Sequence, residues 1–300
     1  RADIIDVVGD TALFLENGQE SRVIEFSVST GRYLGQINHR GQGPEEYRIM
    51  LSAIADPASG TLLIPLIDRP AALAYTLATD SFAGEKSYTP SMRPAPALGG
   101  TSSCINIPDM GPAGFILRQY DTGFAPVDSI VMEGFIPGNV STYMGTADGN
   151  GVIMIADTLY NILPGHLEQS AIISRGDKGI TFDQEGEIMR QAIEGGADEV
   201  ELMRPYIIVR DIQTTGNHIA VTTMHDRAKT TAIYRLSDGA LLCSKTYPEL
   251  SKKSSINLMI GGKPVTVDNL FARNGHWYGI ADGESDGSTN STLVSFDIAD

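Results

Sequence analysis

The stretch that decides the fold reads Arg22-Val23-Ile24-Glu25-Phe26-Ser27-Val28, Ser29-Thr30-Gly31, Arg32-Tyr33-Leu34-Gly35-Gln36-Ile37. Val23 and Phe26 give the first segment its apolar positions, and Tyr33 and Ile37 give them to the second. Alternation over a short run is typical of a strand that is buried on one face. Between the segments, Gly31 is able to take a positive φ in a tight turn. The stretch therefore predicts an antiparallel β-hairpin.

The same design returns about 210 residues later. Thr231–Leu236 leads through Ser237-Asp238-Gly239 into Ala240–Lys245. Between and after these hairpins come further strand-sized segments, namely 53–56, 61–66, 72–77, 115–118, 127–131, 152–155, 159–163, 270–273, 276–281 and 292–297. They group into six units at a spacing of roughly 40 to 70 residues, with about four segments in each.

Four strands in each unit favour the blades of a β-propeller over the rungs of a solenoid. Six blades in 300 residues leave about 50 residues for each. A two-sheet sandwich is the competing all-β architecture, but about 20 or more strands overfill it. We predict a six-bladed β-propeller with four-stranded blades, formed by residues 1–300 as a single domain. The strand-like segment Ala2–Val8 is a candidate to complete the last blade beside 292–298.

One segment, 184–204, departs from the strand pattern because it lacks alternating β-branched residues. Ile188, Ala192 and Ile193 fall on one side of a helix, and Gly195-Gly196 is suited to end it. We therefore expect a short helical insertion between the fourth and fifth blades.

The composition excludes several classes of protein. With 37 acidic and 22 basic side chains the net charge is −15, which argues against nucleic acid and anionic membrane surfaces as partners. No apolar run reaches the roughly 18 residues that span a bilayer. The sequence begins Arg1-Ala2-Asp3 without a methionine, so we expect a targeting or lipid-attachment segment to precede it. Of two arrangements for Cys104 and Cys243, two buried thiols are favoured over a disulfide.

A motif follows the first hairpin directly. It reads Asn38-His39-Arg40-Gly41-Gln42-Gly43-Pro44-Glu45-Glu46-Tyr47. Together with the hairpin it resembles the signature of a six-bladed propeller family of secreted and lipid-anchored proteins from gut Bacteroidetes. That signature has a Gly-Gln-Gly-Pro-Gly-Glu-Tyr stretch and an aspartate that closes the next strand, a place that Asp56 takes here. Glu45 stands where the family has its third glycine. The resemblance implies a periplasmic or cell-surface protein that is lipid-anchored or secreted.

Two interpretations of this motif remain open. In the structural one, which we favour, Gly41 and Gly43 allow positive φ and close backbone approach, Pro44 directs the exit, and Glu46 bonds across an inter-blade corner. Tyr47 can pack across the same corner. In the other interpretation, a ligand-binding loop at the mouth of the central channel uses Arg40, Gln42, Glu45 and Tyr47. His225 and Asp226, which follow the strand segment 219–224, are further candidate ligand-binding residues.

No local pattern indicates a catalytic or transition-metal site. The histidines form no His-x-x-x-His pair. We therefore predict no catalytic residues, no metal ligands and no cofactor, with Ca²⁺ as the one ion for which oxygen-rich stretches occur, at 148–151 and 282–290. One of Trp277 and Tyr278 is expected to face outward, where it would suit stacking against a sugar.

Two functions remain. The first is a non-enzymatic cell-envelope propeller whose loops bind a protein or glycan partner. The alternative is a metal-assisted hydrolase or lactonase for a small polar substrate. It needs carboxylates that converge on a bound cation, and those to inspect are Asp56, Asp68, Asp157, Asp211 and Asp226. We favour binding, and the sequence gives no indication of the oligomeric state.

Overall fold

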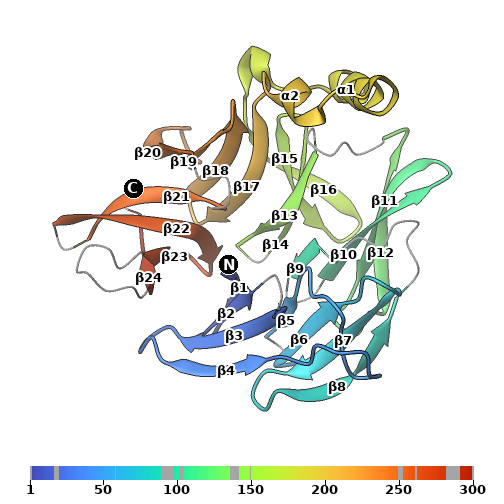
Figure 1. Cartoon of the computed structure of the whole chain (residues 1–300), viewed down its shortest axis with the longest axis vertical. Coiled ribbons are helices and arrows are strands. Elements are labelled where there is room, and N and C mark those ends of the chain that lie inside the picture. Colours follow the sequence, from blue (N-terminus) through green and yellow to red (C-terminus); the bar gives the residue numbers. More distant parts are fainter. Residues whose placement is uncertain are drawn as a thin grey trace. The chain divides into compact units, whose positions relative to one another are not determined.

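The computed structural model describes residues 2–16, 20–57, 59–88, 98–101, 104–135, 142–148, 150–248, 253–260, 262–281 and 291–298. Within these ranges, six four-stranded antiparallel sheets follow one another along the chain, as Figure 1 shows. Each sheet is built from four consecutive strands. They are the blades that the sequence predicts.

The first blade contains β1 (Ala2–Val8), β2 (Thr11–Glu16), β3 (Arg22–Ser27) and β4 (Tyr33–Ile37). The second contains β5 (Ile54–Asp56), β6 (Thr61–Pro65), β7 (Ala71–Thr76) and β8 (Ser81–Ser87). The third contains β9 (Leu98–Thr101), β10 (Cys104–Gly111), β11 (Gly114–Tyr120) and β12 (Pro126–Glu133). The fourth contains β13 (Thr142–Ala147), β14 (Asn150–Ile155), β15 (Thr158–Leu163) and β16 (His166–Ile172). The fifth contains β17 (Ile208–Thr215), β18 (His218–His225), β19 (Ala228–Arg235) and β20 (Leu241–Tyr247). The sixth contains β21 (Ser255–Ile260), β22 (Lys263–Arg273), β23 (His276–Ala281) and β24 (Thr292–Phe296).

Both hairpins that suggested the repeat are confirmed. β3 pairs with β4, and β19 pairs with β20, each with a bulge near the turn. The turn glycines Gly31 and Gly239 have φ of 66° and 71°. Only residues without a Cβ reach this region at low cost, so these two glycines fix where each hairpin turns.

The expectation that 2–8 completes the last blade is wrong. β1 pairs with β2 of its own blade, from Ala2 opposite Glu16 to Val8 opposite Thr11. The buried Ile4 and Val7 side chains belong to this first sheet, and β24 pairs with β23.

The chain packs as two compact units, and each has its cores between neighbouring blades. One unit covers 1–135 with the hairpin ends 149–151 and 163–166, and the other covers 136–148, 152–162 and 167–300. In the first unit, Leu13 and Val23 of blade one share a core with Leu62 and Leu73 of blade two. Blades two and three share another core. In the second unit, blade five packs against blade four on one face and against blade six on the other. Blade five therefore has apolar residues on both of its faces.

The predicted helical insertion is confirmed between β16 and β17. α1 (Phe182–Gly195) begins at Thr181, whose side chain forms a capping box with Gln184, and it ends at Gly196 with φ of 65°. α2 (Glu199–Met203) follows. Ile188 and Met203 pack with Ile180 and Ile208, which attaches the insertion to the start of blade five. Ile193 does not share this face, because 77% of it is exposed.

Candidate functional site

A pocket of 460 Å³ lies along blade five in the second unit. Its floor comes from side chains that face each other across β18 and β19. Ile219 is opposite Tyr234, Val221 is opposite Ala232, and Thr223 is opposite Thr230. Alternation along a strand places these residues on one face, the face that packs against blade four. The pocket forms where that packing leaves blade five uncovered.

The facing wall comes from β16 and the segment that follows it, with Ala171, Ile173 and Arg175 among the lining residues. Ala171 and Ile173 pack against the blade-four and blade-five core. Ser170 and Ser174 add hydroxyl groups to this wall. The pocket thus combines an aliphatic floor with hydroxyl groups on both sides.

Two arginines line the pocket, and each has an acidic partner. The Arg175 guanidinium bonds Asp157 at 2.7 Å and also donates to the carbonyl oxygens of Ala156 and Ile207. Its side chain is only 2% exposed. Arg235 lies 3.7 Å from Asp238 at the opposite end. Neither arginine is thus an unpaired cation for a ligand.

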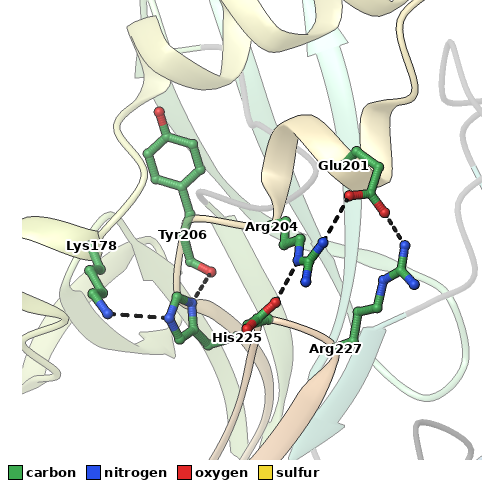
Figure 2. A network of polar contacts seen from close by, with 7 residues as sticks. Lys178, Glu201, Arg204, Tyr206, His225 and Arg227 are labelled. Atoms are coloured by element: carbon green, nitrogen blue, oxygen red, sulfur yellow. Dashed lines mark hydrogen bonds and ion pairs between the residues drawn. The ribbon is translucent and has the colours of Figure 1, made fainter.

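Above one end of the pocket, α2 meets the turn between β18 and β19 through alternating charges (Figure 2). Glu201 of α2 accepts from Arg227 and lies 3.3 Å from Arg204. Arg204 in turn donates to Asp226. Hydrogen bonds from Arg227, then Arg204, lower the pKa of Glu201, and the bond from Arg204 lowers that of Asp226. The four groups form one chain of ion pairs that ties α2 to the hairpin.

The turn that these ion pairs reach has an unusual backbone. Asp226 and Arg227 have φ of 47° and 63°. Positive φ at both central residues is the geometry of a type I′ turn, for which Asn-Gly or Asp-Gly is preferred because an ordinary side chain is costly there. Here the two central residues are Asp226 and Arg227, and the side chain of each is held in an ion pair.

His225 lies at the same end, as the next residue of β18 on the pocket-facing row after Thr223. Its Nε2 lies 3.2 Å from Lys178 Nζ, and its Nδ1 lies 3.3 Å from the Tyr206 carbonyl oxygen (Figure 2). An ammonium only donates and a carbonyl only accepts, so the contacts assign the proton to Nδ1 and leave Nε2 as acceptor. The imidazole is neutral in this arrangement.

The motif after β4 forms a closed loop in the first unit. Tyr47 N–H donates to the His39 carbonyl oxygen at 3.1 Å, and Gly41 N–H donates to that of Tyr47 at 3.0 Å. The Glu46 carboxylate turns inward and accepts from Gly43 N–H at 2.7 Å. Neither glycine has a positive φ, so that part of the expectation is wrong. A Cβ at Gly41 would instead overlap the Glu46 carboxylate, and one at Gly43 would stand 3.0 Å from it.

Tyr47 is fully buried, which separates it from the other ligand-binding candidates of the loop. Its ring meets Tyr75 edge-on, and Tyr75 stacks on His39 with ring centroids 4.7 Å apart. Burial raises the pKa of Tyr47 to about 12. Arg40, Gln42 and Glu45 are exposed around the rim of the same loop. Pro44, at the bend of the loop, is exposed too. Ligand binding by this rim stays a prediction.

The carboxylates considered for an enzyme are dispersed over separate contacts. Asp56 accepts from Ser59 at 2.6 Å, and Asp68 lies 3.8 Å from Arg69. Asp157 pairs with Arg175, and Asp226 with Arg204, as described above.

Asp211 is the most enclosed of these carboxylates, with only 2% of its side chain exposed, and it lies within 3.3 Å of Tyr143, Gln213 and Lys253. Burial beside this carboxylate holds the pKa of Tyr143 well above its usual range. No cluster of three or more acidic, histidine or cysteine side chains suited to a metal ion occurs within the part of the chain that the structure describes.

Other sequence expectations have mixed outcomes. Trp277 and Tyr278 are 1% and 8% exposed, so neither faces outward as a sugar platform. Cys243 has a free thiol, half-buried against blade six, and burial raises its pKa. The side chain of Cys104, the segment 282–290 and Gly149 of the 148–151 turn lie outside the described residues. In the ranges that are described, no helix is long and apolar enough to cross a membrane.

The pocket residues were not identified from the sequence. The available signal was Thr223 and Thr230, hydroxyl residues that stand at pocket-facing positions of otherwise aliphatic strands. A threonine there indicates a face that its neighbour does not fully cover. The sequence gave no signal for four charged residues at the end of the pocket, because their spacing does not indicate that they meet at the turn between β18 and β19. They are Lys178, Glu201, Arg204 and Arg227.

Comparisons with known proteins agree with this architecture. A family model described as a 6-bladed beta-propeller matches residues 3–97. A solved structure described as an exported protein from Bacteroides fragilis has a TM-score of 0.67 at 15% identity, covering 93% of this chain and 79% of the other. A member of the duf4221 family from Bacteroides vulgatus has a TM-score of 0.58 at 12% identity, covering 99% and 92%. No curated protein matches the sequence. With the six sheets, these findings confirm the predicted six-bladed β-propeller.

Proposed function

We propose that this propeller is a binding protein of the cell envelope that holds a sugar residue of a glycan in the blade-five pocket. The observation that carries the proposal is the pocket lining, in which Thr223, Thr230 and Ser174 accompany the aliphatic side chains. Binding sites for small molecules have this composition, with an apolar surface and a few polar groups that fix orientation. At 460 Å³ the pocket is within the range of such sites.

A sugar suits this lining because its ring has apolar C–H faces and hydroxyl groups at its edge. The C–H faces would pack on Ile219, Val221 and the half-buried ring of Tyr234. The hydroxyl groups would exchange hydrogen bonds with the threonine and serine side chains. Tyr234 supports this role further, because no described residue forms a hydrogen bond with its hydroxyl group.

A location outside the cytoplasm is the second part of the proposal. It is supported by the likeness to an exported protein of the same fold and by the resemblance of the motif at 38–47 to a secreted family. A glycan ligand is compatible with that location, because cell surfaces and their surroundings carry such polymers.

A glycan array probed with the labelled protein tests the binding function. Two variants alter the pocket. Thr230→Val removes a hydroxyl group, which also bonds the Thr246 hydroxyl at 2.8 Å, at nearly constant shape, and Ala232→Leu fills the floor. Ser87→Val, on the exposed strand β8, is the matched control. We expect defined glycans to bind the wild type and the control. In both pocket variants the binding affinity should fall by about tenfold or more, which corresponds to about the free energy of one hydrogen bond. The proposal fails if the variants bind as the wild type does, or if only peptides bind.

A further inference from the structure

We infer that the pocket selects an acidic sugar, and that Lys178 with His225 binds the carboxylate of that sugar. This inference rests on the proposed glycan function and specifies its substrate class. It starts from an imbalance of charge at the end of the pocket next to α2. The three arginines there are all paired: Arg175 with Asp157, and Arg204 and Arg227 with Glu201.

Lys178 differs from these arginines. Within the described ranges no carboxylate lies within ion-pair distance of its ammonium group, and the contact that the structure gives it is the 3.2 Å approach to His225 Nε2. A neutral imidazole is a weak partner for a cation compared with a carboxylate, because charge-assisted pairs are about twice as strong. Figure 2 shows the lysine side chain extended toward the imidazole. The site therefore has a cation that an incoming anion can pair with.

Neither Lys178 nor His225 lines the pocket itself, but each lies next to a residue that does. The Ile207 N–H donates to the Lys178 carbonyl oxygen at 2.8 Å, and Ile207 lines the pocket. His225 follows Thr223 on the pocket-facing row of β18. A sugar on the floor formed by Val221 and Thr223 would thus direct one substituent toward Lys178 and His225.

The backbone holds both groups in position before a ligand arrives. His225 Nδ1 is held by the Tyr206 carbonyl oxygen, so the ring keeps Nε2 toward Lys178. Gly179 pairs with Ile207 as an isolated bridge, which fixes the backbone next to Lys178. A carboxylate that enters would replace His225 Nε2 as the hydrogen-bond acceptor for the Lys178 ammonium group. His225 Nε2, once it has taken up a proton from the solvent, would donate to the second carboxylate oxygen while Nδ1–H stays on the Tyr206 carbonyl oxygen.

The net charge of −15 limits the kind of acidic ligand. A long polyanion would be repelled by the protein as a whole. A single carboxylate on a sugar ring meets mainly the local cation, since other charges are screened beyond roughly 8 Å at physiological salt. We therefore assign the site to a glycan that carries isolated uronic acid residues, not to a densely charged polymer.

Calorimetric titration of the intact chain at 0.15 M salt tests this inference. The probes are sodium glucuronate and galacturonate, with glucose and galactose as their uncharged counterparts. We expect the acidic sugars to bind about tenfold more tightly than the neutral ones. Lys178→Gln should abolish that preference while leaving the neutral sugars unaffected, and Lys178→Arg should retain most of it. Lys263→Gln, an exposed lysine of the same unit, is the matched control.

The outcomes separate this inference from the proposed function. Equal binding of acidic and neutral sugars by the wild type overturns the inference and leaves the glycan pocket intact. A preference that persists in Lys178→Gln also overturns it. If no sugar of either kind binds, both the inference and the proposed function fail. Melting curves of each variant exclude misfolding as the cause of a loss.

Discussion

The backbone of Gly41 lies directly against the carboxylate of Glu46, in space that a Cβ atom at position 41 would overlap. The same carboxylate accepts the Gly43 N–H at 2.7 Å. In Gly41→Ala the Glu46 side chain has to move and that hydrogen bond is lost. We predict a loss of about 1–2 kcal/mol in the free energy of unfolding, or about 2–5 °C in Tm, measured by scanning calorimetry.

Gly35→Ala is the matched control for this variant, because its Cβ would stand at an ordinary 3.7 Å from Glu25 and its φ is not positive. A double-mutant cycle with Glu46→Ala isolates the contact. The Gly41→Ala cost should shrink once the carboxylate is gone. An equal cost with and without Glu46 would show that the overlap is not its cause.

Because Tyr47 is buried, we predict that the free energy of unfolding falls at alkaline pH. Burial raises its pKa from 10 to about 12, so the folded state favours the neutral phenol. This stabilisation is complete below pH 10, where the unfolded phenol is also neutral, and it is lost as the pH rises to 12. A shift of this size corresponds to about 2–3 kcal/mol. Tyr47→Phe has no phenol to ionise, so its urea-unfolding free energy should fall less between pH 10 and 12.

The exposed Tyr33 supplies the control for that experiment. Tyr33→Phe should follow the wild-type pH dependence. If Tyr47→Phe loses as much stability as wild type over the same range, the buried phenol is not responsible for the alkaline loss.

For Glu201 we predict the opposite pH dependence, a loss of stability as the pH falls. Its pKa is lowered below 4.5 by bonds from Arg227 and Arg204, so it stabilises the folded state above that pH. The contribution is lost as the pH falls through the lowered pKa. The Tm of the wild type should therefore fall more between pH 7 and pH 3 than the Tm of Glu201→Gln. Glu168→Gln, which alters an exposed glutamate of β16, should behave as wild type. An unchanged slope in Glu201→Gln would contradict the role of the ion pairs.

Removal of divalent cations tests the remaining cofactor prediction. The described residues contain no metal-ligand cluster, so we expect EDTA to leave Tm unchanged. An ion that binds only the folded state would raise Tm by mass action. A drop in Tm with EDTA that Ca²⁺ reverses would contradict the expectation and direct attention to the oxygen-rich stretch 282–290.

The fold was predictable from the sequence because its determinants are local. Turn glycines such as Gly31 and Gly239 and the strands that flank them are neighbours in sequence. The helical insertion was predictable for the same reason, since Gly196 ends α1 within its own segment. Trp277 and Tyr278 show the limit of alternation. It predicts that one of two neighbours faces outward, but both side chains are buried, and Trp277 packs in the core that blades five and six share.

The candidate site was not predictable, because it depends on contacts between distant segments. Lys178 and His225 are 47 positions apart, and their contact requires the segment after β16 to lie against β18. The sequence singled out His225 and Asp226 from their place at a strand end. It gave no means of finding their partners. Lys178 lies in the segment before the helical insertion, and Arg204 lies at the end of the insertion.

The binding of a glycan in the blade-five pocket is tested most directly by methyl NMR of the isoleucine side chains. Ile172, Ile173, Ile207 and Ile219 line the pocket, and Ile49, exposed just beyond the motif loop, reports on the alternative site. During titration with a glycan identified on the array, we expect the methyl signals of the four pocket isoleucines to shift and the Ile49 signal to stay unchanged. Shifts confined to Ile49, with the pocket signals unchanged, would contradict this expectation and assign binding to the loop at 38–47.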